Sequence, residues 1–236
     1  MRLLAIDTAT SAGSAALLTE QGMFSEHFLR SRVTHSERLL STVDALLEEA
    51  GWHISSIDAF AVCIGPGSFT GLRIGLAATK GLAWAGDKPL FGVSSLEAIA
   101  MGFPYARCRV CPVIDARKGQ VFCALYLPGT GGAIEQIGEE VSVEPERLAA
   151  SLNEQTLLAG NGLRLYRRVF EEAMGERALF APESLWYSRA SVVGLAALKR
   201  FENGERPSAD AVNANYVRPS DAEIKFGTRG INENTE

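Results

Sequence analysis

A glycine-rich segment is the first group of residues that could do chemistry. Gly65-x-Gly67-x-x-x-Gly71 lies between an apolar run and a helical pattern. A glycine turn from a strand into a helix can direct backbone N–H groups and the positive end of the helix at an anion. It is no dinucleotide fingerprint, because Thr70 stands where the third glycine belongs, and the chain has no Walker A motif. The alternative is a tight turn with close helix packing, and the spacing leaves both interpretations open.

The second group is Asp7-Thr8-Ala9-Thr10-Ser11, a carboxylate at the end of a first strand followed by small hydroxyl residues. Some sugar kinases and chaperone ATPases hold a metal and a phosphate at such a turn. Their hairpins usually carry Gly where Thr8 stands, since a phosphate needs a close backbone approach. The favoured interpretation is a turn whose hydroxyls satisfy its own backbone. A vestigial nucleotide or anion site is kept beside it, formed by Asp7, Thr8, Gly65, Gly67 and Ser68.

The third group centres on His35. His35 and Leu39 have the i, i+4 spacing at which two histidines on a helix share a metal, but Leu39 leaves the pair incomplete. Cys108-x-x-Cys111 has no second pair and no downstream His, so we interpret the cysteines as reduced thiols. The chain lacks H-E-x-x-H and G-x-S-x-G, the motifs of zinc proteases and esterases. The sequence therefore predicts no metal site.

Composition bounds the kind of protein. The chain has 236 residues, is 47% hydrophobic and 22% charged, and carries a net charge of −5, which fits a globular protein of one large or two small lobes. An isoelectric point near 5.4 excludes a global electrostatic footprint for nucleic acid. No apolar run is long enough for a membrane span, and the N-terminus turns acidic too early for a signal peptide. We expect a cytoplasmic protein without membrane contact.

Hydrophobic patterning predicts an α/β fold in which one order of elements occurs twice. In the first copy, strands are expected at 2–7, 13–18, 23–29, 57–64 and 90–93, and helices at 35–50, 72–85 and 95–100. In the second copy, strands are expected at 110–114, 120–127, 134–143 and 157–160, and helices at 145–152, 163–174 and 189–201. A capping box, Thr34 and Glu37, opens the first helix. Each copy starts with a strand ending in Asp, at Asp7 and Asp115.

These elements predict two lobes, residues 1–104 and 105–219, followed by a polar tail at 220–236. The last helices could pack back on the first lobe. The helix at 35–50 has a broad apolar arc, and the helix at 72–85 carries a line of small residues that would let another helix approach. Packing within the chain is the default for both helices, and the width of the apolar arc leaves room for a second buried face.

Five segments of the chain resemble one protein family. They are LAIDTA at 4–9, HSERLL at 35–40, GPGSFTGLRIG at 65–75, DARKG at 115–119 and NYVRP at 215–219. They resemble the TsaB family, also called YeaZ, within the wider glycoprotease-like family, and the resemblance covers nearly the whole chain. The eleven-residue glycine-rich run is specific for the wider family. The missing second histidine points to the TsaB branch.

The resemblance implies a duplicated actin/Hsp70/sugar-kinase-like fold, two lobes each with a mixed sheet and helices. It implies a role in forming N6-threonylcarbamoyladenosine beside the anticodon of tRNAs that read ANN codons. The catalytic relative TsaD carries H-x-x-x-H and transfers the threonylcarbamoyl group. With Leu39 at the second histidine position, this chain is expected to be a non-catalytic scaffold and activator of TsaD, without catalytic residues. Older descriptions call the family a peptidase, but nothing in this sequence supports a peptide-cleaving site.

The family also implies partners. We expect TsaD and the ATPase TsaE to join the assembly, a homodimer when the chain is alone, and tRNA contact only through the complex. No cofactor is expected, except ATP or ADP at the partner interface. The pairing surface should be the two helices after the first three strands, at His35, Leu39, Leu40, Val43, Leu46, Leu47, Leu72, Gly75, Leu76 and Ala78. The alternative function is a nucleotide-binding, ATPase-like switch or enzyme using Asp7 and the glycine-rich loop.

Overall fold

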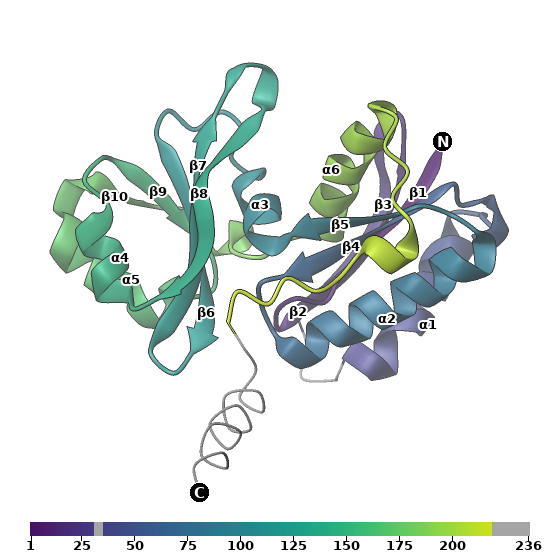
Figure 1. Cartoon of the computed structure of the whole chain (residues 1–236), viewed down its shortest axis with the longest axis horizontal. Helices are drawn as coiled ribbons and strands as arrows, with labels where there is room; N and C mark the ends of the chain where they lie inside the picture. The colour runs from purple at the N-terminus through teal and green to yellow at the C-terminus, as the bar shows by residue number, and fades with distance from the viewer. Residues whose placement is uncertain (31–34, 219–236) are drawn as a thin grey trace, which may run out of the picture.

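The computed structural model describes residues 1–30 and 35–218, without the side chains of residues 35 and 36. The polar tail predicted at 220–236 and Thr34 of the capping box lie outside the described residues. The described chain forms two sheets flanked by helices, one sheet from each half of the sequence (Figure 1). None of the described helices is both long enough and apolar enough to cross a bilayer.

The first sheet begins as an antiparallel meander and continues with two parallel strands. Its strands are β1 (Arg2–Asp7), β2 (Ala12–Thr19), β3 (Gly22–Arg30), β4 (Ala59–Gly65) and β5 (Leu90–Ser94), in the order β3-β2-β1-β4-β5. β4 pairs in parallel with both β1 and β5. This agrees with its continuous apolar sequence, which is typical of a strand buried on both faces.

The second sheet repeats this topology. Its strands are β6 (Arg109–Arg117), β7 (Gln120–Pro128), β8 (Ile134–Val143), β9 (Thr156–Ala159) and β10 (Ala178–Phe180), in the order β10-β9-β6-β7-β8. The first three strands again form an antiparallel meander, and β9 again pairs in parallel with the first strand of its copy. The repeat confirms the predicted class: an α/β protein with a duplicated actin/Hsp70/sugar-kinase-like fold.

Helices cover the sheets. They are α1 (His35–Glu49), α2 (Phe69–Gly86), α3 (Ser95–Ala100), α4 (Pro145–Ser151), α5 (Leu163–Met174) and α6 (Ala190–Glu202). Single 3₁₀ turns occur at Ile54–Ser56, Thr130–Gly132, Gly175–Arg177, Glu183–Leu185 and Ala209–Ala211. α1 and α2 lie side by side on one face of the first sheet, and α6 lies on the other (Figure 1).

The core of the first sheet has two layers, because alternate side chains of β1 point to opposite faces. Leu4 and Ile6 pack with the apolar side chains of α1, whereas Leu3 and Ala5 pack with those of α6. All four are fully buried. α6 approaches closely at Gly194, where a Cβ atom would lie 2.2 Å from a methyl carbon of Leu18.

Two features differ from the sequence-based expectation. α2 begins at Phe69 instead of residue 72, because the Ser68 hydroxyl caps it by accepting from the Gly71 amide. β10 was not predicted, since a strand of three residues carries too little periodicity. α6 follows the second copy in sequence and packs on the first sheet, a placement that the sequence left open for the last helices. The proposed lobe boundary at 104/105 falls in the connection between α3 and β6.

Candidate functional site

The carboxylate of Asp7 is part of the turn that follows β1. Its side chain is buried, with only 2% of the residue exposed. Oδ1 accepts a hydrogen bond from the amide of Ala9 at 2.8 Å, and Oδ2 accepts one from the hydroxyl of Ser188, just before α6. Both oxygens thus have partners in this chain. A metal or a metal-bound phosphate would have to displace these hydrogen bonds. Because the groups are buried, their loss would lower the stability of the fold.

The glycine-rich loop packs against that same turn. A Cβ atom at Gly67 would lie 2.2 Å from the carbonyl oxygen of Ala9, and one at Gly71 would lie 2.1 Å from that of Thr8. One at Gly75 would lie 2.3 Å from the Thr8 hydroxyl oxygen. The glycines are therefore required for close approach of the chain to itself. Of the two interpretations left open by the spacing, the contacts support packing.

The remaining groups of the predicted anion site also have partners within the chain. The amide of Ser68 donates to the Ala9 carbonyl at 2.7 Å, and the Thr8 hydroxyl donates to the Gly71 carbonyl at 2.7 Å. Gly65 has a φ of +104°, and its missing side chain gives room to Leu72. The positions of close backbone approach at this turn are thus occupied by the protein's own backbone and side chains.

The second copy builds the same turn from different residues. The Oδ1 atom of Asp115 accepts from the amide two residues on, that of Arg117, at 2.9 Å, as Asp7 does with Ala9. A Cβ at Gly160, after β9, would lie 2.2 Å from the Val113 carbonyl. β1 ends at Asp7 as expected, whereas β6 continues beyond Asp115 to Arg117. Both aspartates are nevertheless turn-forming residues, and the close glycine approach occurs in both copies.

The two turns face each other across a cavity of about 430 Å³ between the copies. Its lining includes residues 9–11, Gly67–Phe69, residues 114–118, Phe122, Asn161 and Arg218. The basic side chains there have partners: Arg117 pairs with Asp115 at 3.5 Å, and Arg218 donates to Gln120 at 3.2 Å. The cavity is the equivalent, in this chain, of the cleft that the duplicated fold leaves between its halves.

Two half-buried carboxyl groups lie where the copies join. Glu140 of β8 accepts from the Ser94 hydroxyl at the start of α3 and from the Asn215 side chain at 2.5 Å. Burial raises the pKa of Glu140, although the hydrogen bonds from Ser94 and Asn215 oppose the shift. Burial also raises the pKa of Glu97 in α3, with the charge of Arg200 opposing it. These groups connect the second sheet, α3 and the C-terminal segment.

The H-x-x-x-H position has no metal-binding geometry in the described part of the molecule. Leu39 is buried in the core between α1 and the first sheet. The side chain of His35 lies outside the described residues. His27 pairs with Glu49 at 2.9 Å, and no group of three His, Cys, Asp or Glu among the described residues could hold a metal.

Most of the residues predicted for the pairing surface belong to the core. The structure buries Leu39, Val43, Leu46, Leu47, Leu72 and Gly75 beneath α1 and α2. These six pack within the chain, and their assignment to the interface stays a prediction. Leu76 and Ala78 are half-buried, and only Leu40 is well exposed, with 59% of its surface accessible. The apolar arc of α1 is wide because it fills the space above the sheet.

The sequence-based prediction of the pairing surface did not include the exposed face of α2. Trp84 is 59% exposed, and Ala77 and Gly81 are exposed beside it. The spacing of residues 77, 81 and 84 places them on one face of the helix, a signal that the sequence contained. With Leu40 on the neighbouring α1, they form what we call the α1–α2 outer face: Leu40, Leu76, Ala77, Gly81 and Trp84.

Comparisons with known proteins identify relatives along the whole chain. Residues 30–226 match the TsaD family, described as tRNA N6-adenosine threonylcarbamoyltransferase. The chain is 30% identical over 231 residues to the tRNA threonylcarbamoyladenosine biosynthesis protein TsaB of Bacillus subtilis, covering 96% of this chain and 98% of that protein. It is 40% identical over 148 residues to TsaB of Escherichia coli, covering 62% of this chain and 64% of that protein.

Comparison with solved structures supports the same relationship. YeaZ from Pseudomonas aeruginosa superposes with a TM-score of 0.78 at 33% identity, over 91% of this chain and 99% of that one. The ethanolamine utilization protein EutJ from Carboxydothermus hydrogenoformans, at 12% identity and a TM-score of 0.52 over 83% of this chain and 89% of that one, shares the fold alone. Full-length sequence similarity, the duplicated topology and the Leu39 substitution agree with one another, and the chain belongs to the TsaB (YeaZ) family.

Proposed function

We propose that this chain takes part in forming threonylcarbamoyladenosine on tRNA, as the non-catalytic partner of a TsaD-type transferase. The TsaB relatives are named for this modification, which supports the pathway. The observation that carries the partner role is the contrast between two regions. The groups that could do chemistry, at Asp7 and the glycine-rich loop, are bonded within the chain. The α1–α2 outer face instead exposes large apolar side chains to solvent.

The composition of the α1–α2 outer face suits a helical partner. Tryptophan is the residue type most enriched among those that dominate binding energy at interfaces. Leu40 and Trp84 are each 59% exposed, so each still has a large apolar area to bury. Ala77 and Gly81 add little bulk to the exposed side of α2, and nothing lies within 4 Å of where a Cβ of Gly81 would be. A partner helix could therefore approach α2 closely.

The charge of α1 favours a protein over RNA on the α1 side of this face. Its sequence, HSERLLSTVDALLEE, contains four acidic residues and one arginine. Asp44 and Glu48 are exposed and would repel tRNA phosphates. In this proposal the transferase carries the tRNA contacts, and the chain contributes binding surface and positioning. TsaE would join the same assembly, and a homodimer through the same face would form when the transferase is absent.

Co-elution with the TsaD protein of the same organism tests the proposal. Wild-type chain should elute as a complex, and Leu40→Glu should elute separately, because a charge would be buried at the contact. Leu165→Glu is the matched control, since Leu165 is an equally exposed leucine on α5 of the other copy. It should leave the complex intact. Retention of the complex by a folded Leu40→Glu variant would remove the α1–α2 outer face from the proposal.

A further inference from the structure

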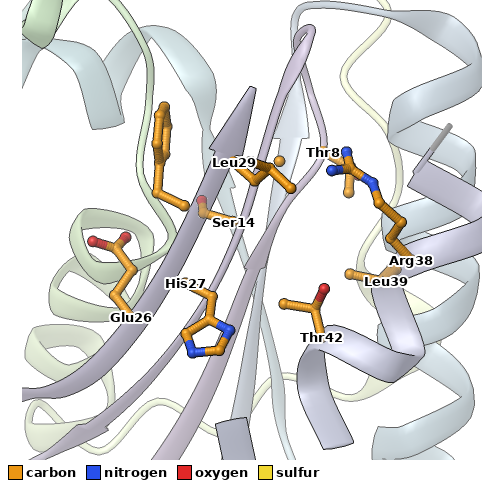
Figure 2. A pocket seen from close by; sticks show the side chains of 10 residues that line it. Thr8, Ser14, Glu26, His27, Leu29, Arg38, Leu39 and Thr42 are labelled. Carbon is orange, nitrogen blue, oxygen red and sulfur yellow. The ribbon is translucent and has the colours of Figure 1, made fainter. Parts of the chain in front are cut away.

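A second cavity, apart from the cleft between the copies, lies beneath the first turn of α1. It has a volume of about 400 Å³, a size that fits a small ligand. Thr8 closes one end, and Arg38, Leu39 and Thr42 of α1 form one wall (Figure 2). The cavity lies on the inner side of α1, whereas Leu40 of the α1–α2 outer face is exposed to solvent.

The register of β2 and β3 explains why the cavity exists. Gly13 pairs with Leu29, and Ala15 pairs with His27. Ala15 packs on the α1 side of the sheet, and Gly13, two residues earlier, has the same orientation. A glycine there adds no side chain to the space between sheet and helix. The side chains of Leu29 and Leu39 supply apolar walls.

Arg38 gives this cavity its charge. The guanidinium group of Arg38 points toward Thr8 (Figure 2). Its Nε atom is buried and has no hydrogen-bond partner among the described residues. A buried donor without a partner lowers stability, and an acceptor atom on a bound molecule would satisfy it. Thr42 is one helical turn further along the same wall and offers a hydroxyl.

The carboxylates near the cavity do not serve Arg38, because they have other partners. Glu26 has both oxygens engaged on the α6 side: Oε1 accepts from the Ser191 amide at 3.0 Å, and Oε2 pairs with Arg189 at 2.7 Å. Glu49 pairs with His27 at the other end of α1. The cavity therefore presents one positive charge, with apolar walls on the side of Leu29 and Leu39.

We infer that this cavity binds a small monocarboxylate with an apolar body. The fork of donors on a guanidinium matches the two oxygens of a carboxylate. One cation balances one negative charge, whereas a phosphate dianion would leave charge uncompensated in a partly buried place. The carboxylate would lie against Arg38 and Thr42, and its hydrocarbon part would lie between Leu29 and Leu39 above Gly13.

Titration of the ¹⁵N-labelled full chain with hexanoate, followed by NMR, tests this inference. We expect saturable shifts of the arginine Nε–H signal of Arg38 and of amides in β2 and α1, with a Kd of about 1–10 mM, as expected for a ligand with so few non-hydrogen atoms. Hexanamide, which has the same shape without the charge, should bind at least tenfold more weakly. Inorganic phosphate should cause no saturable shift at these signals.

Three variants separate the cavity from general effects. Arg38→Gln should abolish hexanoate binding, and Gly13→Val should weaken it by filling the floor while keeping the charge. Arg73→Gln, on the exposed side of α2, should change nothing. The inference is overturned if hexanoate does not bind, if folded Arg38→Gln binds it as tightly as wild type, or if hexanamide or phosphate binds better than hexanoate.

Discussion

The carboxylate of Asp7 accepts a hydrogen bond from the hydroxyl of Ser188, 181 residues further along the chain. Asp7 ends the first strand of the first copy, and Ser188 lies just before α6, which returns from the second copy to cover the first sheet. The residue that the sequence offered as a ligand for metal or phosphate is thus a buried structural contact between distant segments. Its expected consequences differ from those of a catalytic aspartate.

Replacing Asp7 should therefore affect folding. Asp7→Ala removes the acceptor for the Ala9 amide and the Ser188 hydroxyl, and leaves both buried groups unsatisfied. We expect a loss of about 2–4 kcal/mol in the free energy of unfolding, measured by urea denaturation. Asp44→Ala, at an exposed position of α1, should change it by less than about 0.5 kcal/mol. Equal stabilities of the two variants would show that the Asp7 contacts contribute nothing.

Nucleotide binding follows from the same contacts. Because the turn at Asp7–Ala9 and the glycine loop fill each other's space, ATP and ADP with Mg²⁺ should give no micromolar binding by calorimetry with the chain alone. Micromolar binding of ATP to the wild-type chain that Asp7→Ala abolishes, in a variant shown to be folded, would revive the alternative of a nucleotide-dependent switch.

Two glycines of the same region should respond to alanine in opposite ways. Gly67→Ala would place a Cβ 2.2 Å from the Ala9 carbonyl oxygen, so the backbone must shift and stability must fall. Gly81 lies within α2 with open space around its Cβ position, and alanine there should raise the free energy of unfolding by about 0.5–1 kcal/mol. Thermal unfolding of both variants provides the test. A Gly67→Ala variant as stable as wild type would contradict the packing interpretation.

Leu40 and Val43 distinguish surface from core within one turn of α1. Leu40 is 59% exposed, whereas Val43 is 4% exposed. Leu40→Glu should leave monomer stability nearly unchanged, and Val43→Glu should lower it by at least about 3 kcal/mol, because a charge enters an apolar core. Unfolding should be measured at several protein concentrations, so that loss of pairing is not mistaken for loss of folding. A well-folded Val43→Glu variant would contradict the placement of α1.

Acidic residues between the copies make stability depend on pH. The pKa values of Glu97 and Glu140 are raised by burial above the ordinary value of 4.5, so the folded state holds their protons more tightly than the unfolded state. Their contribution to stability is present below pH 4.5 and is lost as the pH rises through the raised pKa values. Glu97→Gln should therefore gain stability over wild type as the pH increases from 4.5 toward 7. Parallel stability curves for the two proteins would refute this assignment.

The sequence predicted the duplicated fold well because its signals are local and strong. β1 and β4 are continuous apolar runs, and both were expected within two residues of their observed bounds. It left open whether the last helices pack on the first sheet, because that placement depends on the fit of Gly194 over Leu18. That contact joins residues far apart in the chain.

The candidate sites were harder to predict for a related physical reason. An apolar helix arc has the same pattern whether it covers its own sheet or a partner, and only burial separates Val43 from Leu40. A glycine has the same appearance whether phosphate or backbone approaches it. Trp84 could have been found from its position on the polar side of α2, whereas the cavity at Arg38 depends on the pairing of Gly13 with Leu29.

Reconstituted tRNA modification tests the central claim most directly. TsaD, TsaE and the adenylate-forming enzyme are supplied with tRNA, with and without this chain, and threonylcarbamoyladenosine is quantified. The account predicts modification only when the chain is present, a loss of at least tenfold with Leu40→Glu or Trp84→Ala, and full activity with Leu165→Glu. Full modification without the chain, or transfer by the chain in the absence of TsaD, would contradict it.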